Sequence, residues 1–194
     1  NTYTGNTTIS SGTLELIGAS QLNSGNYAGN IIKVGAFRYN SSLDQTLSGT
    51  ISGAGAFTKL NNGTLTLTGN NSYSGTTTVS RGILNFSAGT TTVGTFLVDG
   101  GTLQFSGGNV SAQAGASTWD VNITNGGTLL VSGSATVTMP GVVSVGTAAS
   151  GTGYLTQTGG TLTINGLSGT NPADRGLTLA EYTSSVAQFD QSGG

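Results

Sequence analysis

The chain has 194 residues, of which 5 are Lys or Arg, 7 are Asp or Glu and none is His or Cys, so its formal net charge is −2. This net charge argues against electrostatic binding to nucleic acid or to an anionic membrane. Because the chain has no thiol and no imidazole, disulfides, thiolate metal sites and histidine-based catalysis are excluded. No apolar run approaches the roughly 18 residues of a membrane helix. We therefore expect no metal, no cofactor and no membrane insertion by this segment.

The first predicted strands lie in the stretch "NTYTGNTTISSGTLEL", residues 1–16. Thr7 and Ile9 alternate with outward residues, and Leu14 and Leu16 do so again after a corner at Gly12. Side chains two residues apart share one face of a strand, so each pair points toward the same core. The sequence predicts two short strands joined by a glycine corner.

The triplet Gly-Thr-Leu, or a close variant, opens a predicted strand at six places along the chain. The first step after Gly63 is 19 residues, and so is the next. The paired inward residues are Leu14/Leu16, Leu65/Leu67, Leu84/Phe86, Leu103/Phe105, Leu129/Val131 and Leu162/Ile164. If these strands stack, the twelve side chains form two apolar columns. The glycines expected to give positive φ at the following corners are Gly18, Gly69, Gly107, Gly133 and Gly166.

A second strand precedes several of these triplets, and no segment shows a convincing helical stripe. Its inward pairs are Thr7/Ile9, Thr77/Val79, Phe96/Val98 and Val121/Ile123. Near the end of the chain, an offset of 34 residues aligns Val143/Val145 with Leu177/Leu179 and Leu155 with Phe189. We therefore expect strands there too, with "TNPADRG" (170–176) as the most loop-like insertion.

Units of about 20 residues with two or three short strands are typical of a β-solenoid. We predict an all-β fold, a parallel β-helix with some longer rungs, forming one segment over residues 1–194 within a longer array or filament. Eight or nine turns at about 4.8 Å each make a rod on the order of 40 Å long. A β-sandwich also suits short strands and glycine turns, but it does not explain the recurring triplet.

The phrase "GAGAFTKLNNGTLTLTGNNSYSGTTTVSRGILNF", residues 53–86, is repeated in part by residues 1–16. Both resemble the autotransporter-associated β-strand repeat, also called the passenger-associated transport repeat. Phe57, Lys59, Leu65, Leu67, Gly69, Asn71, Tyr73, Gly75 and Thr77 fill corresponding positions of its pattern. The resemblance implies a right-handed parallel β-helix in a secreted or surface-displayed bacterial protein. It also implies a scaffold, with no catalytic residue to transfer.

The carboxylates of the chain form no local motif. Asp99 and Asp120 both follow a predicted strand in adjacent rungs, so stacking could bring them together as a glycosidase pair. The plainer interpretation is that the carboxylates are separate solvated corner residues. The five cations, which could serve a polysaccharide lyase, are widely spread: Lys33, Arg38, Lys59, Arg81 and Arg175. We predict no enzyme activity.

Threonines invite a comparison with ice-binding solenoids, whose flat faces carry two threonine columns. The outward residue before each inward Leu reads Thr13, Thr64, Ile83, Thr102, Thr128 and Thr161, which is regular. The outward residue after it reads Glu15, Thr66, Asn85, Gln104, Leu130 and Thr163, which is not. A two-column lattice therefore fails on these strands, and β-branched packing between rungs explains the first column better.

We conclude from the sequence that the chain is a non-catalytic structural module of the bacterial cell surface or exterior, either a passenger stalk or a filament subunit. The expected partners are neighbouring rungs or head-to-tail copies of the chain. The alternative is a carbohydrate-binding or adhesion module whose aromatic residues contact surface glycans. Its candidates are Tyr3, Tyr73, Phe37, Tyr39, Tyr154 and Trp119.

Overall fold

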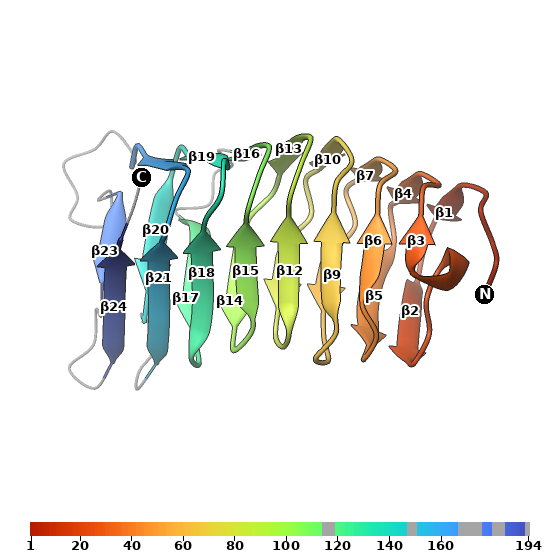
Figure 1. Ribbon diagram of the computed structural model, residues 1–194, viewed down its shortest axis with the longest axis horizontal. Helices are drawn as coiled ribbons and strands as arrows, with labels where there is room; N and C mark the ends of the chain where they lie inside the picture. The colour runs from red at the N-terminus through yellow and green to blue at the C-terminus, as the bar shows by residue number, and fades with distance from the viewer. Residues whose placement is uncertain (114–118, 147–150, 167–175, 180–184, 193–194) are drawn as a thin grey trace.

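The computed structural model describes residues 1–113, 119–146, 151–166, 176–179 and 185–192. Its strands form three parallel sheets of eight strands each, which we name sheets A, B and C. In Figure 1 the chain rises through sheet C in front, crosses the top through sheet A and descends behind through sheet B, advancing from right to left. This is a right-handed winding, so the predicted parallel β-helix is confirmed.

Each turn of the solenoid supplies one strand to each sheet. Sheet A contains β1 (Thr7–Ile9), β4 (Ile31–Lys33), β7 (Ile51–Gly53), β10 (Asn71–Tyr73), β13 (Thr90–Val93), β16 (Asn109–Ala112), β19 (Thr136–Met139) and β22 (Thr161–Ile164). Sheet B contains β2 (Thr13–Gly18), β5 (Ala36–Ser41), β8 (Phe57–Lys59), β11 (Thr77–Val79), β14 (Phe96–Asp99), β17 (Trp119–Thr124), β20 (Val142–Val145) and β23 (Leu177–Leu179). Sheet C contains β3 (Asn26–Tyr27), β6 (Gln45–Leu47), β9 (Thr64–Leu67), β12 (Ile83–Phe86), β15 (Thr102–Phe105), β18 (Gly127–Val131), β21 (Thr152–Gln157) and β24 (Val186–Gln191). A single 3₁₀ turn, η1 (Asn23–Gly25), is found among the described residues.

The register between rungs follows the repeat seen in the sequence. Ser52 pairs with Ser72 and Leu65 with Leu84, so the middle rungs advance by 20 or 19 residues. The last rung is longer: Val143 pairs with Leu177 and Leu155 with Phe189. The alignment at an offset of 34 residues is therefore confirmed. Most of the loop expected at 170–176 lies outside the described residues.

The six Gly-Thr-Leu strands do not lie in one sheet, which corrects the prediction of two continuous apolar columns. Only the four pairs from Leu65/Leu67 to Leu129/Val131 stack in sheet C. Leu14 lies on β2 of sheet B, and Leu162 lies on β22 of sheet A. The second-strand set is divided in the same way, because Thr7 and Ile9 lie in sheet A and the other pairs in sheet B. A strand in any of the three sheets needs only inward apolar residues at every second position. The same sequence motif can therefore form a strand in sheet A, B or C.

The core is a narrow column of inward side chains closed by neighbouring rungs. Phe86, Phe96 and Phe105 are buried, with ring centroids 5.5 to 6.0 Å apart. Phe37 stacks on Phe57 at 5.4 Å in sheet B. Aromatic contacts of this kind add to the free energy gained from burial alone. Rungs therefore depend on their neighbours for a closed core.

Two different physical requirements explain the recurrent glycines. Gly18, Gly133 and Gly166 have positive φ, as predicted, whereas Gly69 and Gly107 do not. Gly69 is needed for close approach, because a Cβ there would lie 2.2 Å from the carbonyl oxygen of Gly49. A Cβ on Gly75 would likewise lie 2.0 Å from the oxygen of Gly55. Corner glycines thus let successive rungs stack at strand spacing.

Candidate functional site

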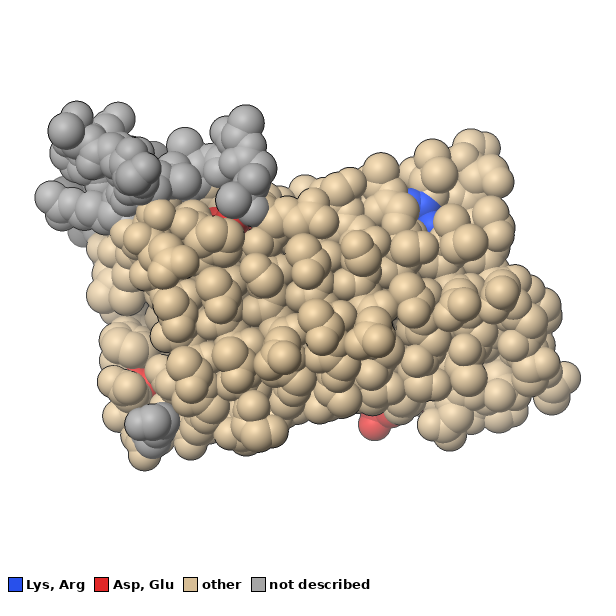
Figure 2. Space-filling view, turned by 90° about the horizontal axis from the view of Figure 1, so that it is seen from above, with Lys and Arg blue, Asp and Glu red and all other residues tan. Residues whose placement is uncertain are grey.

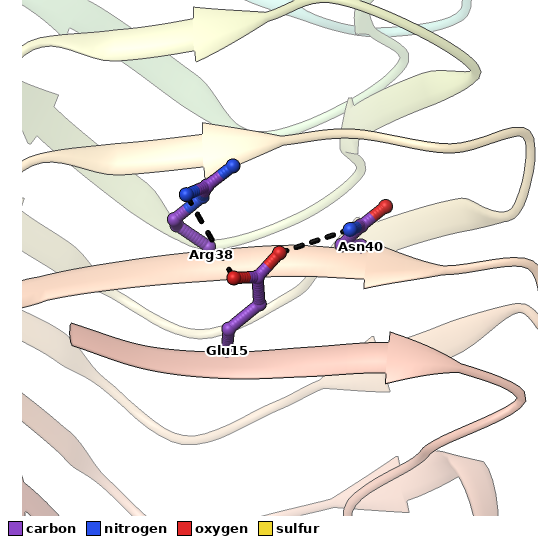
Figure 3. Close-up of polar contacts among 3 residues, drawn as sticks. All are labelled: Glu15, Arg38 and Asn40. Carbon is purple, nitrogen blue, oxygen red and sulfur yellow. Dashed lines mark hydrogen bonds and ion pairs between the residues drawn. The ribbon is translucent and has the colours of Figure 1, made fainter.

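Glu15, Asp44, Asp99 and Asp120 are each held by polar partners on a neighbouring rung, while Asp190 accepts a hydrogen bond from Gln188 of its own strand. Glu15 pairs with Arg38 across sheet B, with 3.7 Å between Oε2 and Nη1, and accepts a hydrogen bond from Asn40 Nδ2 at 2.9 Å (Figure 3). This is the one ion pair within the described ranges, and it lies on the surface, where such pairs contribute little. Asp44 Oδ1 accepts from the backbone N–H of Thr64 at 2.7 Å. Asp174 and Glu181 lie outside the described residues.

Asp99 and Asp120 do not form a carboxylate pair. Asp99 ends β14 and pairs in register with Thr124, the last residue of β17, whose hydroxyl donates to it at 3.1 Å. Asp120 lies near the start of β17, toward the other end of the strand from Thr124 and beside a register shift. Stacking therefore separates the two groups that a glycosidase would need close together.

Asp120 also corrects the interpretation of the carboxylates as solvated corner residues. It is 2 % exposed, and its Oδ2 accepts a hydrogen bond from the backbone N–H of Gly141. Burial raises the pKa of Asp120, while that hydrogen bond acts in the opposite direction. The group anchors one rung to the next, and no carboxylate of the described residues joins it.

Two of the four cations in the described part of the chain point inward, which the sequence did not reveal. Lys33 and Lys59 are fully buried at the ends of β4 and β8. Lys59 Nζ donates to the carbonyl oxygens of Leu60 and Asn61, both at 2.7 Å, and of Arg81 on the next rung at 3.2 Å. Each ammonium group thus ties together backbone carbonyls at a corner of the solenoid.

Tyrosine rings lie beside both lysines. Lys33 Nζ donates to the carbonyl of Gly55 and lies 3.9 Å from the centroid of the Tyr73 ring. Lys59 Nζ lies 5.6 Å from the ring centroid of Tyr39. Burial lowers the pKa of each lysine to about 8. A base of this kind is chemically useful only where substrate can reach it, and these two side chains have no exposed surface.

Asparagine side chains form a ladder at the corner that precedes sheet A, a feature missed in the sequence. Asn6 Oδ1 accepts from Asn30 N, and Asn30 Oδ1 accepts from Thr50 N, both at 2.9 Å. Asn70 Oδ1 accepts from Thr90 N at 2.8 Å. The recurrence of Asn at this corner was the available signal. The ladder satisfies backbone donors where strand pairing begins.

The aromatic residues considered as sugar platforms divide into two groups. Phe37, Tyr39 and Tyr73 are buried, so they form corners of the core. Tyr3 and Tyr154 are exposed, while Trp119 is half-buried. Tyr3 stacks on Tyr27 with centroids 6.1 Å apart, close to the first rung, and Tyr154 lies on the outer face of sheet C. The exposed pair is therefore too far apart to form one continuous platform.

No group of three or more Asp, Glu, His or Cys residues gathers within the described ranges in a way that could hold a metal ion. The same part of the chain has no helix of the length and apolarity required to span a bilayer. The polar side chains described above connect neighbouring rungs of the solenoid.

Comparison with known proteins identifies the repeat. Residues 1–16 and 57–86 match the family model of the passenger-associated transport repeat. The predicted resemblance is confirmed, with the second match beginning at Phe57 where Gly53 had been expected. No curated protein and no solved structure matches the chain. The second match includes the buried Lys59 and Tyr73 described above, and also Asn71, which is buried and whose Oδ1 accepts a hydrogen bond from the backbone N–H of Ile51.

Proposed function

Since the chain carries passenger-associated transport repeats, we propose that it is a non-catalytic structural segment of a bacterial passenger protein at the cell surface or outside the cell. The repeat and the β-solenoid fold fit a structural passenger-type module. The observation that carries the proposal is the stacking of successive rungs into three eight-stranded parallel sheets, with one register shift at the start of β17. It makes the polypeptide a stiff rod whose stability is nearly a sum over rungs and their interfaces.

The chemistry of the buried groups supports the same proposal. Three buried groups that could act as a base or an acid in an exposed cleft instead make hydrogen bonds to the backbone of a neighbouring rung. These groups are Lys33, Lys59 and Asp120. Polar contacts used in this way hold the corners in register. A scaffold requires such contacts, whereas catalysis requires groups that substrate can reach.

Solution scattering and an activity screen together test the scaffold. We expect the purified chain to scatter as an elongated rigid rod. We also expect it to leave a panel of neutral and acidic polysaccharides uncleaved. A compact particle would contradict the rod, and turnover abolished by Lys33→Met or Lys59→Met in a folded variant would contradict the non-catalytic role.

The edges of the sheets suggest self-association as a further proposal. Strands β1, β2 and β3 at one end, and β22, β23 and β24 at the other, each have a single neighbour in their sheets. Unpaired strand edges accept another strand, so each end can receive a rung from the same polypeptide or from a second copy. Negative-stain microscopy across a concentration series tests this: fibres that lengthen with concentration support head-to-tail stacking, and strictly monodisperse particles count against it.

Glycan adhesion is the second candidate function. Exposed Tyr3 and Tyr154 favour it, because aromatic faces stack on sugar rings. A glycan array tests it directly. Signals lost in Tyr3→Ala or Tyr154→Ala would support adhesion, and an array without signals would remove this candidate.

A further inference from the structure

The outer face of sheet A carries two regular columns of small uncharged side chains. Over strands β13, β16, β19 and β22, the first column consists of Thr90, Asn109, Thr136 and Thr161. The second column consists of Thr92, Ser111, Thr138 and Thr163. We call these eight residues the sheet A array. All of them are exposed or half-buried, while the residues between the columns point inward.

The array is the two-column lattice that fails on the Gly-Thr-Leu strands. Thr161 and Thr163 had been aligned with the strands of sheet C, but they pair with Thr136 and Thr138 in sheet A. The regular columns therefore become visible only once the strands are assigned to their sheets. The sheet C columns remain irregular, because Asn85, Gln104 and Leu130 occupy one of them.

The spacing of the array is fixed by the backbone. Residues in one column are one strand apart, about 4.8 Å, and the two columns are two residues apart, roughly 6.6 Å along the strand. In Figure 1 the strands of sheet C run side by side with little rotation between neighbouring rungs. Because sheet A is another side of the same coil, its strands rotate as little from rung to rung. Flat parallel sheets are unusual and are stabilised by stacking or by side-chain ladders. At the first strand of the array, Asn70 Oδ1 accepts a hydrogen bond from the backbone N–H of Thr90 and holds β13 in register with the rung before it.

The chemistry of the array is a mixture of hydroxyl and methyl groups held in place. Threonine is stiff at χ1, so both groups keep their positions on a pleated surface. The hydroxyls of Thr92, Thr136 and Thr138 make no hydrogen bond to another residue in the described part of the chain. Their donors and acceptors therefore face outward. A shallow hollow of about 120 Å³, lined by Thr92, Ser111, Thr136 and Thr138 among others, leaves room for a few ordered waters between the columns.

The charge of this face limits what can bind to it. No Lys, Arg, Asp or Glu projects outward from β13, β16, β19 or β22. The face in Figure 2, on the side where sheet A lies in Figure 1, shows almost no charged atoms. Charged polymers and anionic membranes find no complementary charge there. No aromatic side chain projects from these strands either, so a sugar polymer lacks a stacking platform.

We propose that the sheet A array binds the surface of crystalline ice. An uncharged flat face with hydroxyls and methyls at about 4.8 Å by 6.6 Å presents a two-dimensional repeat similar to that of the oxygen atoms on an ice surface. The rigid backbone means that binding orders few protein groups, which keeps the entropic cost low. Waters held between the columns can join the ice lattice. The inference is independent of the proposed scaffold role, because a rod can be stiff without binding ice.

A pair of matched variants tests the site. Thr136→Tyr places a bulky side chain in the middle of the array. Thr128→Tyr places the same side chain on the outer face of sheet C, next to Tyr154 in register. Thermal hysteresis and inhibition of ice recrystallisation are measured for the purified chain and for both variants, with melting temperatures recorded for each. We expect the parent chain to arrest ice growth, Thr136→Tyr to lose most of this activity and Thr128→Tyr to retain it.

Three results would overturn the proposal. The first is absence of ice activity in the folded parent chain. The second is equal loss in both variants with unchanged melting temperatures, which would place the activity elsewhere. The third is binding to an insoluble neutral polysaccharide that Thr136→Tyr abolishes, without any ice activity. If Thr136→Tyr lowers the melting temperature, Thr92→Tyr, on β13 of the same array, gives the decisive comparison.

Discussion

The ammonium group of Lys33 lies 3.9 Å from the centre of the Tyr73 ring, two strands further along sheet A. The same group donates to the carbonyl of Gly55 on the rung between them. One side chain therefore connects three consecutive rungs through the core. The ring face and the carbonyl stabilise the charged lysine, while burial opposes the charge and dominates its pKa.

This balance predicts that the solenoid becomes more stable as pH rises above 8. Lys33 and Lys59 have a pKa of about 8 in the folded chain, against an ordinary value of 10.5. Between these values the unfolded chain binds more protons, so the free energy of unfolding increases with pH. Burial raises the pKa of Tyr27, Tyr39 and Tyr73 above 10.0, so the gain reverses at higher pH, where the unfolded chain loses tyrosine protons first.

Urea unfolding at pH values from 7 to 11 measures the effect. We expect a maximum in stability on the alkaline side, near the ordinary pKa of tyrosine. The double variant Lys33→Met/Lys59→Met should lose the rise but keep the fall. A free energy of unfolding that stays level or decreases between pH 8 and 9.5 in the parent chain would contradict the assignment.

A second prediction concerns Asp120→Asn. Burial raises the pKa of Asp120 above its ordinary value of 3.8, so the folded chain holds the proton more tightly than the unfolded chain does. Its ionisation therefore costs stability as pH rises above 3.8. The amide oxygen of Asn can still accept from Gly141 N without burying a charge. We expect a higher melting temperature at pH 7 and a flatter pH dependence in the acid range.

Asp99→Asn is the matched control, because Asp99 accepts from side chains near the surface of the same sheet. It should change the melting temperature little. If Asp120→Asn destabilises the chain at neutral pH, the carboxylate gains more from Gly141 than burial costs it, and the direction of the pKa shift is wrong.

The strands and their repeat were predictable, whereas their assignment to sheets was not. Alternation identified inward residues such as Leu65 and Val121, and the pairing of Leu155 with Phe189 followed from spacing alone. A triangular coil has three equivalent sides, so Leu14 and Leu162 satisfy the same pattern as Leu84 while lying in other sheets. The register of a strand depends on its contacts with the next rung, and the sequence of one repeat does not specify these contacts.

The buried polar residues were not predictable for a related reason. Lys33 and Lys59 occupy inward positions of strands whose other inward residues are apolar, and a lysine there is usually taken as a strand end facing solvent. Their burial depends on carbonyls of the following turns, at Gly55 and Arg81. These two carbonyls are each 22 residues away along the chain. The nearer partners of Lys59, at Leu60 and Asn61, are backbone carbonyls, so no local side-chain motif reveals the site.

Close packing of corners predicts a large effect for Gly75→Ala. The new Cβ would lie 2.0 Å from the backbone oxygen of Gly55, which cannot move without separating the rungs. We expect a loss of about 3 kcal/mol or more, at the upper end of overpacking. Gly12→Ala is the control, because a Cβ added at Gly12 would meet open space while the φ of +68° stays unfavourable for alanine. Backbone strain alone should therefore lower the free energy of unfolding by about 1–2 kcal/mol. Urea unfolding compares the two, and equal losses would show that backbone conformation, not contact between rungs, limits these corners.

Additive rungs predict that damage to the core stays local. Phe86 is fully buried and contacts Phe96 and Phe105, so Phe86→Ala should cost about 3–5 kcal/mol. In a solenoid the lost free energy of unfolding is confined to one rung and its interfaces with the two neighbouring rungs. The amides of β9, β12 and β15 should therefore exchange faster with solvent deuterium. The exchange rates of β4 and β21, which lie further away, should change little. Hydrogen exchange read by mass spectrometry resolves these segments, and Thr66→Ala on the outer face of sheet C serves as the control. Uniform acceleration across all rungs would instead mean that the rod unfolds as one cooperative unit, and the additive description would have to be abandoned.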